Sequence, residues 1–432
     1  MRDSWKECFF EGETSLITKG TTPTSLGKEF KDSGINFIKA ESITNAGKFI
    51  PESFAFIDDD THTILRRSQL QVDDILFSIA GVLGRIAVVD KTILPANTNQ
   101  ALALVRLSNN SKLDRDYIKY FLNGAFVKDQ IRRINVQAAQ ANFSLGDIGR
   151  LNIQYPPLPQ QQKIAQILST CDEVIEKTEA AIAKYQALKQ GMMHDLFTRG
   201  IDVNTGKLRP SYQDAPELYK ESDLGMIPND WKISELEAIT NYVDYRGKTP
   251  PKADKGIFLM TAKNIKFGFI DYEISKEYIP PSAYKAAMTR GIPEIGDVLI
   301  TTEAPMGNVA QINIEGLALA QRVIKYRCYP NEMLNDFLKH SMMAEYFQKE
   351  LEAESTGSTV KGIKGSRLHL LNVMKPSILE QEKIVHGLAP VEAKIDTEQS
   401  ALAKYQQIKA GLMQDLLTGK VEVKVAEEIL KN

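Results

Sequence analysis

The chain has 432 residues, of which 43% are hydrophobic, and its formal net charge is −2. This length predicts two or more domains, and the near-neutral charge excludes a uniformly basic nucleic-acid binder but still permits a local basic face. Three widely separated cysteines exclude a disulfide framework and a cysteine-rich zinc site. The sequence has no run of about 18 apolar residues and no apolar leader, so we expect a cytoplasmic protein without membrane contact.

Residues 1–155 are expected to form a mixed α/β domain. Short runs of β-branched and aromatic residues, bounded by Gly, Pro, Asn and Asp, predict strands at 36–40, 74–80, 85–89 and 101–107. Two periodic segments predict helices at 114–124 and 125–133. Three consecutive aspartates at 58–60 are better explained as a solvated turn than as a metal site, and the five histidines are scattered.

The segment 156–200 predicts one long helix, and the chain contains it twice. Shifted by 220 positions without a gap, it matches 376–420 with 17 of 45 residues identical, including the run Ala-Lys-Tyr-Gln at 183–186 and 403–406. In both copies apolar residues recur every three or four positions, as on the contact stripe of a coiled coil. A rod of about 38 residues is roughly 57 Å long, and its apolar stripe needs a partner.

We expect the two helical copies to pack against each other as an antiparallel coiled coil. The polar residues Thr178 and Glu398 stand at equivalent positions of the stripe and are expected to fix the register. The alternative is an ordinary amphipathic helix on a globular core, but such helices average about 11–12 residues.

Residues 201–220 are polar and rich in turn-forming residues, which indicates a linker. Residues 221–375 then repeat the first domain more weakly. Trp5 corresponds to Trp231 and Gln100 to Gln321, and the offset drifts only between 220 and 227. The residues between the matched positions have diverged, as expected of two copies that do one physical job on two targets.

The expected fold is therefore α+β, with two mixed α/β domains separated by two long helices in a pseudo-two-fold symmetric arrangement. Two similar domains on a stiff spacer suit duplex DNA, whose features repeat about every 34–36 Å along its axis. The expected boundaries are first domain 1–155, central helical repeat 156–200, linker 201–220, second domain 221–375, distal helical repeat 376–420 and C-terminal tail 421–432.

Motifs of catalysis are missing from the sequence. There is no Gly-x-x-x-x-Gly-Lys-Ser/Thr loop for phosphates, no Asn/Asp-Pro-Pro-Tyr/Phe run of an amino-methyltransferase, and no His-Glu-x-x-His zinc motif. We therefore expect a chain without catalytic residues, bound metal or cofactor of its own.

The helical repeats resemble those of the specificity subunits of type I restriction-modification systems. The resemblance rests on the motifs Pro-Pro-Leu-Pro-Gln-Gln-Gln-Lys-Ile at 156–164, Ala-Lys-Tyr-Gln at 183–186 and Gly-Met-Met-His-Asp-Leu at 191–196, which the distal copy repeats. The run Asp-Leu-Gly-Met-Ile-Pro-Asn-Asp-Trp at 223–231 also resembles the family's entry to its second recognition domain. The resemblance covers nearly the whole chain.

The resemblance implies two target recognition domains, each reading one half of a bipartite sequence in double-stranded DNA. The helices would set the spacing and dock two modification subunits, which are methyltransferases, together with restriction subunits. S-adenosylmethionine, ATP and Mg²⁺ would bind only to those partners. Two alternatives remain open: a coiled-coil scaffold that ignores DNA, and a metal-dependent nuclease with an unrecognised site.

Base and phosphate contacts require Arg, Lys, Asn, Gln, Ser or Thr on loops and edges. The glycine-rich stretch 355–365 is the best single loop, because small residues let the backbone approach a phosphate. The predicted DNA contacts are Lys39, Arg66, Arg67, Ser78, Arg85, Arg132, Arg133 and Asn142 in the first domain, and Arg246, Lys248, Lys263, Asn264, Lys266, Thr301, Thr302, Arg322, Lys361, Lys364 and Arg367 in the second.

Overall fold

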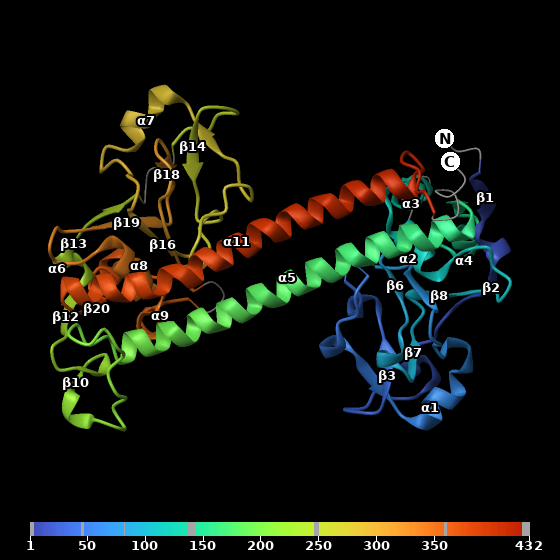
Figure 1. Ribbon diagram of the computed structural model, residues 1–432, viewed down its shortest axis with the longest axis horizontal. Coiled ribbons are helices and arrows are strands. Elements are labelled where there is room, and N and C mark those ends of the chain that lie inside the picture. Colours follow the sequence, from blue (N-terminus) through green and yellow to red (C-terminus); the bar gives the residue numbers. More distant parts are fainter. Residues whose placement is uncertain are drawn as a thin grey trace. The chain divides into compact units, whose positions relative to one another are not determined.

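A computed structural model describes residues 4–44, 47–81, 83–136, 143–245, 250–357 and 361–425. Its contacts divide the chain into two compact units, Met1–Ala180 with Gln399–Asn432, and Ala181–Glu398. The long helices α5 (Leu158–Thr198) and α11 (Ile378–Leu417) therefore each contribute one half to each unit (Figure 1). Each compact unit thus contains one mixed α/β domain and half of each long helix.

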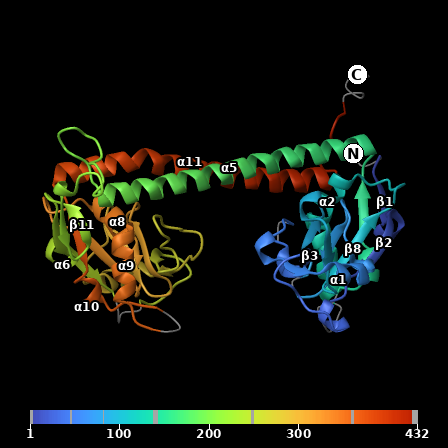
Figure 2. The same cartoon turned by 90° about the horizontal axis from the view of Figure 1, so that it is seen from below.

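The described residues of the first unit form three sheets. The antiparallel four-stranded sheet has the order β2 (Thr14–Lys19), β8 (Leu102–Leu107), β5 (Ile75–Ser78), β6 (Ile86–Val88). The three-stranded sheet has the order β4 (Ala55–Ile57), β3 (Ile35–Ile38), β7 (Ala96–Thr98), and its β3 and β7 are parallel. The third sheet pairs β1 (Lys6–Phe9) with β9 (Asn152–Tyr155). Figure 2 labels β1, β2, β3 and β8 among the strands of these sheets.

The predicted strands of this domain are confirmed as β3, β5, β6 and β8, and the two predicted helices as α2 (Arg115–Asn123) and α3 (Ala125–Val136). The sequence did not predict α4 (Leu145–Gly149) or α1 (Asp59–Ile64). The acidic run at 58–60 begins α1, because the Asp58 carboxylate accepts a hydrogen bond from the Thr61 N–H at 2.8 Å and caps the helix.

The second unit repeats the three sheets in the same order. Its four-stranded sheet runs β13 (Thr240–Asp244), β19 (Val323–Cys328), β16 (Val298–Thr302), β17 (Met306–Gln311). Its three-stranded sheet runs β15 (Tyr278–Ile279), β14 (Ile257–Met260), β18 (Ala318–Leu319), again with one parallel pair, and β12 (Lys232–Glu235) pairs with β20 (Asn372–Lys375). This identical strand order confirms the duplication inferred from the weak sequence matches.

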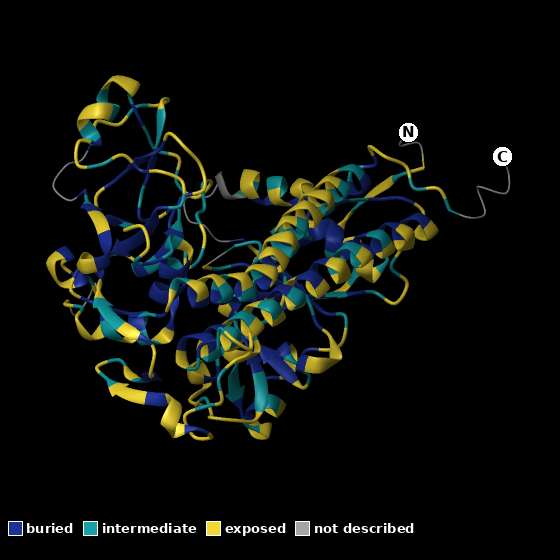
Figure 3. Ribbon diagram, turned by 60° about the vertical axis from the view of Figure 1, so that its left-hand side comes forward, coloured by how far each residue is buried: buried dark blue, intermediate teal, exposed yellow. Residues whose placement is uncertain are grey.

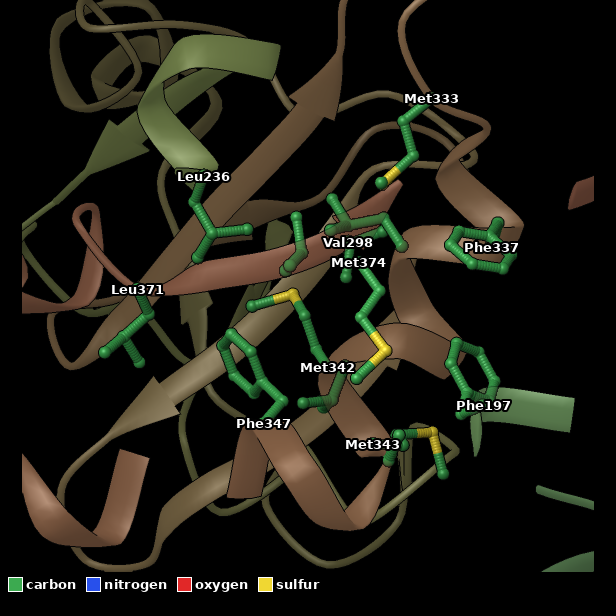
Figure 4. Close-up of a cluster of buried hydrophobic side chains, with 14 of the residues drawn as sticks. Phe197, Leu236, Val298, Met333, Phe337, Met342, Met343, Phe347, Leu371 and Met374 are labelled. Carbon is green, nitrogen blue, oxygen red and sulfur yellow. The ribbon is translucent and has the colours of Figure 1, made fainter. Parts of the chain in front are cut away.

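The second unit adds a hairpin, β10 (Tyr219–Ser222) with β11 (Gly225–Pro228), so the expected linker runs directly into regular structure. Its short helices are α6 (Leu236–Ile239), α7 (Pro281–Ala287), α8 (Asn335–Met343), α9 (Glu345–Ala353) and α10 (Gly365–Leu368). Buried side chains from α5, α8, α9 and the sheets converge in one core, where the Phe197 and Phe337 rings lie 5.2 Å apart (Figure 4).

Within each unit the two long helices pack antiparallel, as predicted. In the first unit Asp172 of α5 pairs with Lys409 of α11, and in the second Lys189 of α5 pairs with Glu392 of α11 at 2.6 Å. The 220-residue offset maps the first ion pair onto the second with the two helices exchanged. Pro390 lies inside α11, and the helix continues on both sides of it.

The polar contacts of the two expected register residues lie within their own helices, so their role in register stays a prediction. The Thr178 hydroxyl donates to the Val174 carbonyl at 2.8 Å, and Glu398 pairs with Lys394 at 2.9 Å, in each case within one helix. Both long helices alternate buried and exposed faces along their length, as the sequence periodicity predicts (Figure 3).

Candidate nucleic-acid interface

Two of the predicted DNA contacts, Ser78 and Thr301, are buried parts of a framework that both units share. They lie near the ends of the central strands β5 and β16, and both are 0% exposed. The Ser78 hydroxyl accepts a hydrogen bond from the Arg85 N–H at 2.7 Å, and the Thr301 hydroxyl accepts one from the Asn308 N–H at 3.0 Å. Because both hydroxyls bind the same turn in their own unit, we assign them to turn geometry and remove them from the proposed DNA contacts.

The two residues whose N–H groups bind these hydroxyls, Arg85 and Asn308, also use their side chains in hydrogen bonds within their own unit. Nη1 of Arg85 donates to the Ile43 carbonyl at 2.8 Å, and Nδ2 of Asn308 donates to the Ile265 carbonyl at 2.8 Å. These four residues are equivalent in pairs, so one loop is fastened to one turn in the same way in both units. We therefore also assign Arg85 a structural role.

Asn264 and Thr302 are the other predicted contacts that folding buries, at 0% and 2% exposure. Asn264 Oδ1 accepts from the Thr261 N–H at 3.0 Å, while its Nδ2 donates to the Asp271 and Ser275 carbonyls at 2.9 and 2.8 Å. An amide with its hydrogen-bonding capacity used in this way holds its own loop and has little left for a base. The polarity of these residues suggested DNA contact, but their burial excludes them as surface contacts.

The other predicted DNA contacts in the described part of the first unit have side chains that are exposed or partly exposed: Lys39, Arg66, Arg67, Arg132 and Arg133. Lys39 Nζ lies 4.8 Å from the centre of the Phe30 ring, and Arg67 Nη2 donates to Thr21 Oγ1 at 3.3 Å. The two arginines of α3 both pair with Asp129, which partly neutralises them. The remaining predicted contact, Asn142, lies outside the described residues.

The second unit holds more exposed or half-exposed basic side chains from the predicted set: Lys263, Lys266, Arg322, Lys361, Lys364 and Arg367. Three of them have acidic neighbours: Arg322 Nε lies 2.8 Å from Glu303, Arg367 Nε lies 3.6 Å from Glu354, and Lys361 pairs with Glu352. Arg246 and Lys248 lie outside the described residues.

The predicted glycine-rich loop at 355–365 is described except for residues 358–360. Its ends are tied together, because Thr356 N–H donates to the Gly362 carbonyl at 2.8 Å and Gly362 N–H donates back at 3.0 Å. Lys364 precedes α10 and its side chain is exposed. Its ammonium group is therefore accessible to a phosphate.

A cleft of about 280 Å³ lies at one end of β14 and β18 in the second unit. It brings together two predicted contacts, Lys263 and Arg322, with two residues that the prediction missed, Lys252 and Gln321. The correspondence of Gln321 with Gln100 in the internal repeat could have indicated Gln321 from the sequence alone. In the first unit the carboxamide oxygen of Gln100 accepts from the Thr22 N–H at 3.1 Å.

A second repeated framework joins a buried aspartate to an arginine across each four-stranded sheet. Nε and Nη2 of Arg106 bind Asp74 at 2.6 and 2.7 Å, and the same atoms of Arg327 bind Asp297 at 2.6 and 2.8 Å. The bond to Asp74 raises the pKa of Arg106. The sequence analysis matched the two aspartates but missed their partners on the neighbouring strand, although Arg106 and Arg327 stand at the same 221-residue offset as Gln100 and Gln321.

Each long helix ends in a left-handed glycine beside a tryptophan, which explains why the tryptophans correspond. Gly200 and Gly419 both have φ of +65°. A Cβ atom on Gly200 would lie 2.6 Å from the Trp231 ring, and one on Gly419 would lie 3.0 Å from the Trp5 ring. Glycine is required here by its φ and by the close approach of the ring.

In the second unit, the buried carboxylate of Glu380 lies beside the C-terminal end of α5. Its oxygens accept from Trp231 Nε1 at 3.0 Å and the Ile201 N–H at 2.8 Å, and they pair with the Arg209 guanidinium. Arg209 belongs to the segment expected to be a linker, so that segment takes part in the core. The equivalent of Glu380 in the first helical repeat is the neutral Gln160.

The ion pairs between the long helices are each backed by a side chain from the neighbouring domain helix. Tyr120 of α2 donates its hydroxyl to Asp172 at 2.7 Å, and the equivalent residue of α8, His340, places Nε2 3.5 Å from Glu392. Burial lowers the pKa of His340 to about 3. The histidine is therefore neutral at physiological pH, and it packs as a polar counterpart of the tyrosine.

Among the described residues, no group of three or more His, Cys, Asp or Glu is arranged to hold a metal ion. None of the helices in the described part of the chain is long and apolar enough to span a membrane.

Comparison with known proteins gives concordant results. The chain is 25% identical to the putative type I restriction enzyme MjaX specificity subunit of Methanocaldococcus jannaschii, over 98% of this chain and 95% of that one. It is 20% identical to the EcoKI specificity subunit of Escherichia coli K12, over 90% and 83%. Its fold is similar to the crystal structure of a type I restriction-modification S subunit from M. genitalium, with a TM-score of 0.57, 15% identity and coverage of 98% and 97%.

The family model of the type I restriction modification DNA specificity domain matches the chain twice, at residues 9–184 and 228–409. Each match contains the four-stranded and the three-stranded sheet of one unit and the greater part of one long helix, as the duplicated architecture requires. The chain therefore belongs to the family of type I restriction-modification specificity subunits.

Proposed function

We propose that each unit reads one half of a bipartite DNA sequence, and that the chain itself has no catalytic role. The main support is a contrast within the chain. Both units keep the same sheets, buried aspartate–arginine pairs and loop fastenings, whereas their exposed basic residues differ. A constant framework with divergent surface groups suits two readers of two different sequences, because base identity is read by side chains that reach the groove edges.

On the exposed faces of the long helices the two helical repeats carry similar residues, whereas the exposed residues of the two domains differ. The identical Ala-Lys-Tyr-Gln runs at 183–186 and 403–406 are largely exposed, and Leu188 and the equivalent Ile408 are 51% and 44% exposed. Folding does not require exposed residues to match, whereas binding the same partner twice does. We propose that these faces dock two copies of one methyltransferase subunit, and that restriction subunits join the resulting complex.

The reading function is tested with the chain assembled with its methyltransferase partners. The complex is incubated with random duplexes, and bound sequences are determined over a salt series. We expect a motif in two parts separated by a fixed gap of unspecified bases. A continuous motif, or binding without sequence preference at any salt concentration, would contradict the proposal. The purified chain with Mg²⁺ should leave DNA uncut, and cleavage would favour a nuclease.

A further inference from the structure

The cleft at one end of β14 and β18 in the second unit differs from the same place in the first unit at two charged positions. The two places can be aligned through the backbone, because the Thr302 N–H donates to the Arg322 carbonyl at 3.0 Å as the Ile79 N–H donates to the Ala101 carbonyl at 2.9 Å. Arg322 is therefore the equivalent of Ala101. The second unit has a long cation at a position where the first has only a methyl group.

A second wall of the cleft shows the same contrast. The Thr261 N–H donates to the side chain of Asn264 at 3.0 Å, as the Lys39 N–H donates to Ser42 at 3.3 Å. This alignment makes Lys263 the equivalent of Glu41. Two aligned positions thus carry two positive charges in the second unit and one negative charge in the first.

Arg322 is held in a defined place. Its φ is +72°, an uncommon conformation for a residue other than glycine, and Ala304 on the same cleft has φ +47°. Its Nε pairs with Glu303 at 2.8 Å, although both side chains are roughly half exposed, at 49% and 43%. The equivalent of Glu303 in the first unit is Ala80, so the acid is present only where the arginine is present.

An ion pair through Nε leaves the terminal Nη nitrogens for another acceptor, and in the described part of the chain they make no hydrogen bond. A guanidinium fixed through one edge presents a planar pair of donors, which suits the O6 and N7 acceptors of guanine in the major groove. Lys263, which also lines the cleft, can donate to the same kind of acceptor. A carboxylate, as at Glu41, would instead repel these acceptors.

We propose that this cleft reads guanine, with Arg322 as the reading side chain, Glu303 as its positioning residue and Lys263 as a second donor. The proposal rests on the proposed function, since it requires that the second unit reads DNA. It implies that the half-site of the second unit contains at least one guanine that is read through Arg322.

The test uses the complete complex of the chain with its methyltransferase partners and compares motifs selected from random duplexes. Arg322→Ala should relax one guanine position in one half of the motif and weaken binding of the full site roughly ten- to hundredfold. Arg322→Lys keeps the charge but loses the planar pair of donors, so it should relax the same position with little change in salt dependence. Lys364→Ala is the matched control, because an exposed phosphate contact weakens all sequences alike.

A base analogue isolates the contact itself. Replacing that guanine by 7-deazaguanine removes the N7 acceptor and keeps base pairing, so it should weaken the wild-type complex and leave Arg322→Ala unaffected. A selected motif without guanine in that half, an unchanged motif in Arg322→Ala, or equal sensitivity of both proteins to the analogue would overturn the proposal. If the wild type selects no bipartite motif, the proposed function itself fails. An unchanged bipartite motif in Arg322→Ala refutes only the guanine reading.

Discussion

Removing the buried carboxylate of Glu380 should strongly destabilise the second unit. The Arg209 side chain is only 10% exposed, so Glu380→Ala leaves a buried guanidinium without its counter-charge, together with the unpaired N–H groups of Trp231 and Ile201. Breaking a buried pair in this way costs about 3–5 kcal/mol. For a unit of this size that corresponds to a fall in Tm of roughly 6–20 °C.

The chain provides its own reporters for this measurement. It has only two tryptophans, one in each unit, and Trp231 is 0% exposed and bonded to Glu380 itself. In a Trp5→Phe background, fluorescence follows the second unit alone during urea or thermal unfolding. The complementary background, Trp231→Phe, follows the first unit, whose transition should not move.

Two further variants separate charge from packing. Glu380→Gln introduces the residue that the first repeat has at Gln160, and it should cost less than Glu380→Ala because the amide still accepts hydrogen bonds. In a double-mutant cycle, adding Arg209→Ala to Glu380→Ala should cost less than the sum of the single changes, since the unpaired charge is removed as well. A loss below about 1 kcal/mol for Glu380→Ala would refute the reasoning, because that is the range of exposed pairs.

Three other predictions concern pH dependence, docking and the helix ends. Burial lowers the pKa of His340 from 6.5 to about 3, so on acidification the unfolded state binds a proton before the folded state does. The free energy of unfolding should therefore fall as the pH drops through this interval, by up to about 1.4 kcal/mol per pH unit. His340→Gln should reduce this slope in acid-unfolding curves. Leu188→Asp and Ile408→Asp should each reduce the number of bound methyltransferase subunits from two to one without lowering the stability of the chain. Native mass spectrometry measures this number, and an unchanged stoichiometry in both variants would rule out this docking surface. Gly200→Ala should lower the free energy of unfolding by more than about 1 kcal/mol, because alanine is strained at the positive φ of this position. Gly387→Ala inside α11, where a Cβ meets nothing within 4 Å, should raise the free energy of unfolding by up to about 1 kcal/mol in thermal unfolding.

The sequence was sufficient to predict features that depend on local periodicity and on the internal repeat. Two gapless copies with an apolar residue at every third or fourth position predict two long helices, and β-branched runs between turn residues predict β3, β5, β6 and β8. The order of domain, helix, domain, helix follows from the same repeat. These signals can be found in one sequence because the periodicity of helices and strands depends on residues that lie close together along the chain.

The tertiary structure decided which polar residues are available to a ligand. Ser78 and Arg322 were equally plausible DNA contacts in the sequence, but the fold buries the first beneath a turn and places the second on an exposed cleft beside Glu303. It also joined Arg209 to Glu380, across 171 positions of sequence. Burial and pairing of this kind depend on contacts between distant segments, and neither composition nor spacing along the chain records those contacts.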